Sequence, residues 1–246
     1  MRRILRAHLP LIALLLVGSV AMLGAAEAAA GGEVKATKSM SLLDLIVVAG
    51  PVEYLLILLS VISYSLAIQW VFTIKRENLI PDGMADELHN IMAEGPSDEA
   101  VENARNLVAN DRSMLGNIIA AALDKKDFGY ETMKDASELV GASETNKYMG
   151  KVGWLSMFAS SATLLGLLGT VSGIIGSFLK MAANPGGVDP NMLSKEIGEA
   201  LVCTGTGLAI AIGNLYFFFW LRGRVNTCSL DAAVITNEIL DYFRAR

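Results

Sequence analysis

The chain has 246 residues, of which 53% are hydrophobic and 18% charged, and its formal net charge is −5. This composition is typical of a membrane protein rather than of a soluble domain. The mild acidity argues against nucleic acid as a partner. Phosphate binding needs a basic surface, and the sequence has no stripe of Lys and Arg with interleaved aromatic residues.

The N-terminus has the layout of a secretory signal peptide. It begins MRRILRAH, continues with an apolar run of about 15 residues and ends in small residues, which predicts cleavage after Ala26, Ala28 or Ala30. An uncleaved first membrane helix is the alternative, although the run is shorter than the ~20 residues that span a bilayer. We expect residues 1–30 to be the signal peptide and residues 31–51 a periplasmic linker.

Three further apolar blocks, of lengths that cross a bilayer, predict three transmembrane helices. Between the first two blocks the chain is polar and acidic, with helix-like stretches separated by breakers such as Gly95-Pro96 and Asp127-Phe128-Gly129. The predicted fold is therefore an all-α membrane protein. Its expected segments are transmembrane helix 52–74, cytoplasmic helical segment 75–151, transmembrane helix 152–181, periplasmic turn 182–196, transmembrane helix 197–221 and cytoplasmic C-terminal helix 222–246.

Basic residues near the span ends set the expected orientation. Lys75 and Arg76 follow the first span, Lys151 precedes the second, and Arg222 and Arg224 follow the third. The positive-inside rule makes that side cytoplasmic. A cleaved signal peptide independently requires a periplasmic mature N-terminus, so both arguments place the C-terminus in the cytoplasm.

Glycines form a stripe along the second span. On an ideal helix, Gly166, Gly169, Gly173 and Gly176 lie on one side. Such a stripe lets another helix backbone approach closely, which is a main source of helix association in lipid. A contact within the monomer and a contact between subunits both fit this pattern.

A second stripe of the same span carries hydroxyl groups at Thr163, Thr170 and Ser177. A single hydroxyl in a membrane helix usually bonds to a carbonyl one turn earlier. Three aligned hydroxyls fit a wall that faces water, an ion or a polar group of a partner helix. Ser172 lies on neither stripe.

The third span contains a carboxyl group at Glu199, followed by an uninterrupted apolar run. An ionised carboxylate is costly there, so Glu199 is a candidate functional residue. The alternative is a carboxylate stabilised by the helix N-terminus and by headgroup water. Thr204 and Thr206 add hydroxyls to this helix. Glu199 and Thr204 are about 140° apart on an ideal helix, whereas Glu199 lines up with Cys203 and Thr206.

The first span also carries polar side chains. Glu53 stands at its expected outer end, and Ser60, Ser63, Ser65 and Gln69 follow inside. We expect these residues to face protein rather than lipid.

No catalytic or metal-binding motif occurs in the sequence. G-x-S-x-G, P-loop and HExxH patterns are absent, and His89 has no recognisable catalytic partner. Cys203 and Cys228 have no metal-ligand spacing and are expected to be small packing or surface residues. We therefore expect no enzyme activity, no cofactor and no metal.

Three stretches resemble the signatures of the ExbB/TolQ/MotA proton-channel family, most of all its ExbB and TolQ branch. They read GPVEYLLILLSVI, ASSATLLGLLGTVSGIIGSF and IGEALVCTGTGLAIAI. The resemblance implies a bacterial inner-membrane protein that forms a ring, usually pentameric, around an ExbD- or TolR-like dimer whose aspartate carries the proton. It also implies that proton-motive force drives a TonB- or TolA-like periplasmic protein, for transport or envelope maintenance.

Matched by motif, Thr170 and Thr204 correspond to the family's pore-lining threonines, and Glu199 to its glutamate at the start of the third signature. Thr163 and Gly213 stand where many members have proline, which leaves the branch and the bending of the helices open. A membrane scaffold that conducts nothing is the alternative function.

Overall fold

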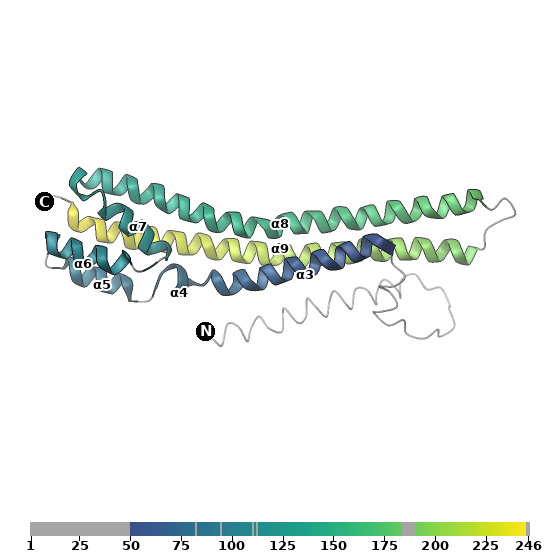
Figure 1. The fold of residues 1–246 in the computed structure, drawn as a ribbon, viewed down its shortest axis with the longest axis horizontal. Coiled ribbons are helices and arrows are strands. Elements are labelled where there is room, and N and C mark those ends of the chain that lie inside the picture. The colour runs from purple at the N-terminus through teal and green to yellow at the C-terminus, as the bar shows by residue number, and fades with distance from the viewer. Residues whose placement is uncertain are drawn as a thin grey trace. The chain divides into compact units, whose positions relative to one another are not determined.

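The computed structural model describes residues 50–81, 83–93, 95–109, 111, 113–183 and 190–244. Every element in this part of the chain is a helix (Figure 1), which confirms the all-α prediction. The expected signal peptide lies outside the described residues, as do residues 31–49 of the linker and residues 184–189 of the turn.

The helices follow one another with short connections. They are α3 (Gly50–Thr73), α4 (Arg76–Leu79), α5 (Met84–Met92), α6 (Asp98–Ala109), α7 (Met114–Leu123), the 3-10 turn η1 (Lys126–Phe128), α8 (Tyr130–Ala183), α9 (Pro190–Leu240) and the 3-10 turn η2 (Asp241–Phe243). Among the described residues, α3, α8 and α9 are long and apolar enough to cross a membrane.

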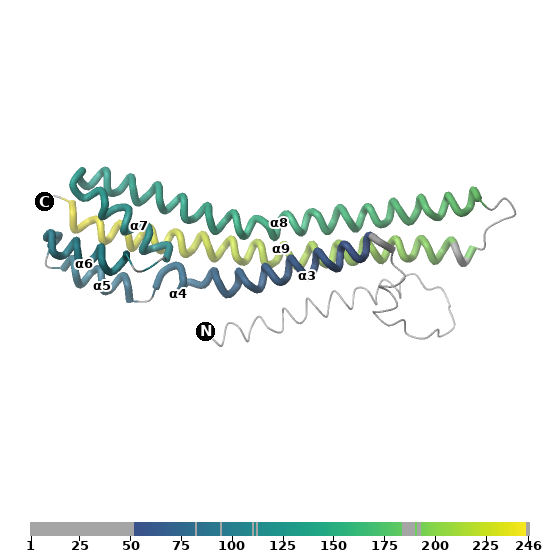
Figure 2. Tube along the Cα trace, in the orientation of Figure 1, coloured from purple at the N-terminus to yellow at the C-terminus, as the bar shows by residue number. Residues whose placement is uncertain are grey.

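α8 and α9 are much longer than a bilayer requires. They contain 54 and 51 residues, and Figure 2 traces each as one continuous helix. Since ~20 residues cross the hydrocarbon core, both helices extend well beyond it. Residues 190–196, expected in the periplasmic turn, are already helical. Pro190 suits the first helical position because its φ is fixed and its missing N–H has no helical partner there.

The described residues divide into two units. The first contains residues 50–67, 155–183 and 190–217, from α3, α8 and α9. Its core is made largely of small apolar side chains: Leu56, Ala159, Ala162, Cys203, Ile210 and Ala211. Large apolar side chains of α8 are exposed instead, among them Leu164, Leu167, Leu168, Ile175 and Phe178. Small residues inside and large ones outside suit helices that pack closely in lipid or against further subunits.

The second unit contains residues 68–154 and 218–244 and has an apolar core of its own. Its fully buried side chains include Leu79, Leu88, Met92, Met114, Leu115, Ile119, Leu123 and Met133. Serine side chains cap the N-termini of α6 and α7. Ser97 Oγ accepts a hydrogen bond from Ala100 N at 3.1 Å, and Ser113 Oγ accepts one from Gly116 N at 3.0 Å. Gly129 precedes α8 with φ 91°, a left-handed conformation that favours glycine.

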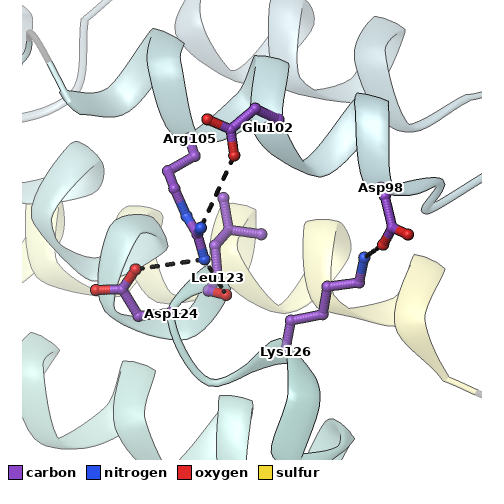
Figure 3. A network of polar contacts seen from close by, with 6 residues as sticks. All are labelled: Asp98, Glu102, Arg105, Leu123, Asp124 and Lys126. Atoms are coloured by element: carbon purple, nitrogen blue, oxygen red, sulfur yellow. Dashed lines mark hydrogen bonds and ion pairs between the residues drawn. The ribbon is translucent and has the colours of Figure 1, made fainter.

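Polar contacts tie α6 to the end of α7 (Figure 3). Arg105 Nη2 donates to the Leu123 carbonyl at 3.2 Å, and the same guanidinium pairs with Glu102 and Asp124 at 3.8 and 3.5 Å. The Leu123 carbonyl lies in the last turn of α7, where it has no partner within the helix. Nearby, a hydrogen bond from Lys126 lowers the pKa of the Asp98 carboxyl below its usual value.

We expect Arg105→Ala to destabilise the α6–α7 contact by about 1 kcal/mol, because it leaves the Leu123 carbonyl without its donor. Hydrogen exchange of the α6 and α7 amides in the whole protein should then be roughly fivefold faster. Lys134→Ala is the control, because the Lys134 side chain forms an exposed ion pair with Glu138, at 4.0 Å. Equal exchange rates in the two variants would contradict this role of Arg105.

Candidate functional site

The first unit is centred on a close contact between α8 and α9. A Cβ atom on Gly207 would lie 2.6 Å from the Ala162 carbonyl oxygen and 3.0 Å from Gly166 Cα. The Thr204 hydroxyl donates to the Gly166 carbonyl at 2.8 Å. The two backbones therefore meet where glycine faces glycine, and an interhelical hydrogen bond fixes their register.

The predicted glycine stripe continues this contact along α8. A Cβ on Gly169 would lie 2.2 Å from Cys203 Sγ, and one on Gly173 would lie 2.6 Å from Ala200 Cβ. A Cβ on Gly176 would have nothing within 4 Å. Gly166, Gly169 and Gly173 thus pack on α9 of the same chain. We call the contact of these three glycines with Gly207, Cys203 and Ala200 of α9 the α8–α9 seam.

The three hydroxyls of the second stripe lie in different environments. Ser177 is buried and donates to the Gly173 carbonyl at 3.0 Å, whereas Thr163 is exposed and Thr170 half-buried. Thr163 and Thr170 donate to carbonyls one turn earlier, at 3.1 and 2.7 Å. Their hydroxyl hydrogens are therefore engaged within α8, and their oxygen lone pairs are left to accept further hydrogen bonds.

Glu199 lies well inside α9, which begins at Pro190. The electrostatic effect of a helix end fades beyond its first turn, so the helix N-terminus does not account for this carboxylate. Lys195 supplies a counter-charge instead, with its Nζ 3.8 Å from Glu199 Oε1. One turn nearer the start of α9, Glu196 pairs with Lys180 of α8.

α3 places a buried carboxyl group beside the seam. Glu53 is only 5% exposed, and the side chains of Thr206 and Cys203 in α9 lie next to its carboxyl group. Its Oε2 atom is buried without a hydrogen-bond partner among the described residues. The sequence indicated polar residues at these positions but did not predict that Glu53 and Thr206 meet.

A second polar contact between α3 and α9 was also missed by the sequence analysis. Asn214 Nδ2 donates to Ser63 Oγ at 3.1 Å and to the Ile210 carbonyl at 2.9 Å, and both side chains are fully buried. Close by, a Cβ on Gly213 would lie 2.2 Å from the Tyr64 hydroxyl oxygen. Gly213, which departs from the resembled pattern, makes room for that ring.

Comparison with known proteins gives a family match. The model of the MotA/TolQ/ExbB proton channel family matches residues 110–232, which include α7, α8 and most of α9. An ExbB-like biopolymer transport protein of Synechocystis sp. is 28% identical over 189 residues, which cover 74% of this chain and 71% of that protein.

Two further relatives match over smaller shares of their own length. Biopolymer transport protein exbB1 of Vibrio cholerae is 32% identical over 104 residues, or 42% of this chain and 46% of that protein. An ExbB homologue of Methanothermobacter thermautotrophicus is 24% identical over 178 residues, or 72% of this chain and 61% of that protein. The chain thus spans less than two thirds of each of these two relatives.

One methyl group added at the α8–α9 seam is expected to lower the stability of the protein. Gly207→Ala places its Cβ against backbone atoms of α8, so α8 and α9 must separate, and we expect a loss of about 1–3 kcal/mol. Gly205→Ala is the control, because a Cβ there would have nothing within 4 Å. Thermal denaturation of the purified protein in detergent measures both. A Gly207→Ala variant as stable as Gly205→Ala would show that the helices do not approach so closely.

Proposed function

Because the chain belongs to the MotA/TolQ/ExbB proton channel family, we propose that it conducts protons together with an ExbD- or TolR-like single-span partner. In this proposal the proton-motive force drives a TonB- or TolA-like periplasmic protein, for transport or envelope maintenance. The chain is an ExbB-like multi-pass protein of the inner membrane, with three helices able to cross the bilayer. The observation that carries the proposal is that the matched segment contains Thr170, Glu199 and Thr204.

The exposed surface of α8 supports assembly into a ring. Thr170 is half-buried, and the exposed side chains of Leu167 and Val171 lie next to it on α8. Large apolar side chains next to a hydroxyl suit a helix that contacts lipid or a neighbouring subunit and also lines a polar path. We propose a ring of copies of this chain, pentameric as is usual in the family, around the partner helices.

The hydrogen bonds of the threonines suggest which form of the partner's aspartate they bind. Thr170 and Thr204 both donate their hydroxyl hydrogens to carbonyls of α8, so only oxygen lone pairs remain. Lone pairs accept a hydrogen bond from a protonated carboxylic acid and repel a carboxylate. We propose that these threonines, with Thr163 on the same side of α8, hold the protonated aspartic acid. Glu199 exchanges the proton with it.

The remaining predicted pore residues have other neighbours. Ser177 is buried beside Gly173, and Thr206 neighbours Glu53 of α3. We therefore propose that Thr163, Thr170, Thr204 and Glu199 line the proton path. Because Glu199 and Thr204 are about 140° apart on an ideal helix, one of the two reaches this path from the side of a neighbouring subunit. For the orientation we propose a periplasmic mature N-terminus and a cytoplasmic C-terminus, because the basic residues flank the spans on the same side.

Proton flux through the complex with its partner, reconstituted in liposomes, tests this proposal. We expect Thr170→Val and Glu199→Gln to lower the flux at least about tenfold, equivalent to roughly 1.4 kcal/mol in the barrier, because each removes a proton-bonding group while keeping the side-chain size. Ser172→Ala is the control, since Ser172 is exposed on α8 away from Thr170. Wild-type liposomes that conduct no protons would favour the scaffold alternative. Unchanged flux in both variants would contradict the residue assignment.

A further inference from the structure

Glu53 is the most deeply buried acidic side chain in the described part of the first unit, which we call the membrane unit. The proposed function gives it no role. Glu53 is 5% exposed, and the apolar core of this unit adjoins it: Leu56 lies one turn further along α3, and Cys203 is a neighbour of the carboxyl group. Within the described residues, no ion pair joins Glu53 to a basic side chain. A buried ionised carboxylate without a counter-charge is costly, so this group needs either a proton or a way out of the core.

Thr206 is the hydroxyl group next to the Glu53 carboxyl. Thr206 has one hydroxyl hydrogen, which it donates to the Val202 carbonyl at 3.1 Å. The contact between the Glu53 carboxyl and the Thr206 oxygen therefore lacks a hydrogen unless Glu53 supplies it. A protonated Glu53 fits, because its O–H can donate to Thr206 Oγ1.

The other neighbours of Glu53 allow the ionised form to exist as well. The first turn of α3 contains Glu53, and a helix N-terminus favours negative charge. On release of the proton, the Thr206 hydroxyl can rotate from the Val202 carbonyl to the carboxylate, and the Cys203 thiol is a second, weaker donor. On α8, Leu165 packs against the core that contains Cys203, and Gly169 lies next to Cys203. Neither residue carries a charge.

We propose that Glu53 is a proton-binding residue of this channel, in addition to Glu199, and that it switches between a protonated form bonded to Thr206 and an ionised form. In the protonated form, Glu53 donates to Thr206 and Thr206 donates to Val202. In the ionised form, the proton has passed to water on the conduction path, and Thr206 donates to Glu53. This inference rests on the proposed function for the path that the proton follows.

A metal cation is a poorer occupant of this position than a proton. Hard cations take about six or more oxygen ligands, whereas the side chains next to Glu53 supply one hydroxyl and one thiol. No group of three His, Cys, Asp or Glu residues in the described ranges is arranged to hold a metal ion.

Infrared spectroscopy of the reconstituted complex tests proton binding directly. The wild type should show a carboxylic-acid carbonyl band that Glu53→Gln removes and that alkaline buffer removes reversibly. Thr206→Val should move that band to higher frequency, because the acid loses its hydrogen-bond acceptor. Thr227→Val is the matched control, since Thr227 of α9 is exposed and makes the same kind of bond, to the Gly223 carbonyl at 3.1 Å.

Proton flux through the same liposomes tests the role in conduction. Glutamine reproduces the protonated form of Glu53, because its amide can donate to Thr206, but it cannot release a proton. We expect Glu53→Gln to keep the complex assembled and as thermally stable as the wild type, and to reduce the flux about tenfold or more. A purely structural role for Glu53 would leave the flux of this variant unchanged.

The outcomes separate this inference from the proposed function. The absence of a band sensitive to Glu53→Gln, or an unchanged flux in that variant, would overturn the inference even when the wild type conducts. If the wild-type complex conducts no protons, the proposed function fails. The infrared band then decides alone whether Glu53 binds a proton.

Discussion

The close contact of α8 and α9 at Gly166 and Gly207 positions the other polar groups of the membrane unit. It lets the Thr204 hydroxyl reach the Gly166 carbonyl, at 2.8 Å, and so fixes how far each residue of α9 lies along α8. That register places Cys203 against Gly169 and Ala200 against Gly173. Cys203, which packs on Gly169 in this register, also neighbours Glu53 of α3. Side chains larger than hydrogen at the seam would move all these partners.

Burial and exposure divide the polar residues of this unit into two groups with different chemistry. Glu53 and Asn214 are enclosed by helices of the same chain: Asn214 of α9 donates to Ser63 of α3, and the Glu53 carboxyl of α3 lies next to Thr206 of α9, so a change in the protonation of Glu53 would affect that packing. Thr163, Thr170 and Glu199 are more exposed and remain available to other chains. In the proposed function, a proton that moves between the two groups would couple conduction to helix packing.

Local features of the sequence predicted much of this structure. Runs of apolar residues indicated the three membrane-spanning helices, and their spacing indicated Gly166, Gly169 and Gly173 as a packing stripe. Gly176 is about 80° from Gly166 on an ideal helix, and it lies outside the seam. The early start of α8, at Tyr130, was not predicted, because charged residues end a hydropathy signal without ending a helix. The pairs Thr204–Gly166, Glu53–Thr206 and Asn214–Ser63 depend on the register between helices, which no single segment encodes.

The seam is tested most directly by asking whether α8 meets α9 of the same chain. Lys180 and Glu196 form an ion pair between these helices, and a carbodiimide converts such a pair into an amide without a spacer. In complexes assembled from equal amounts of isotope-labelled and unlabelled chains, the linked peptides can be separated by mass. We predict that both peptides of each linked pair carry the same label. Pairs that mix labelled and unlabelled peptides would show that the contact joins neighbouring subunits and would contradict the seam described here.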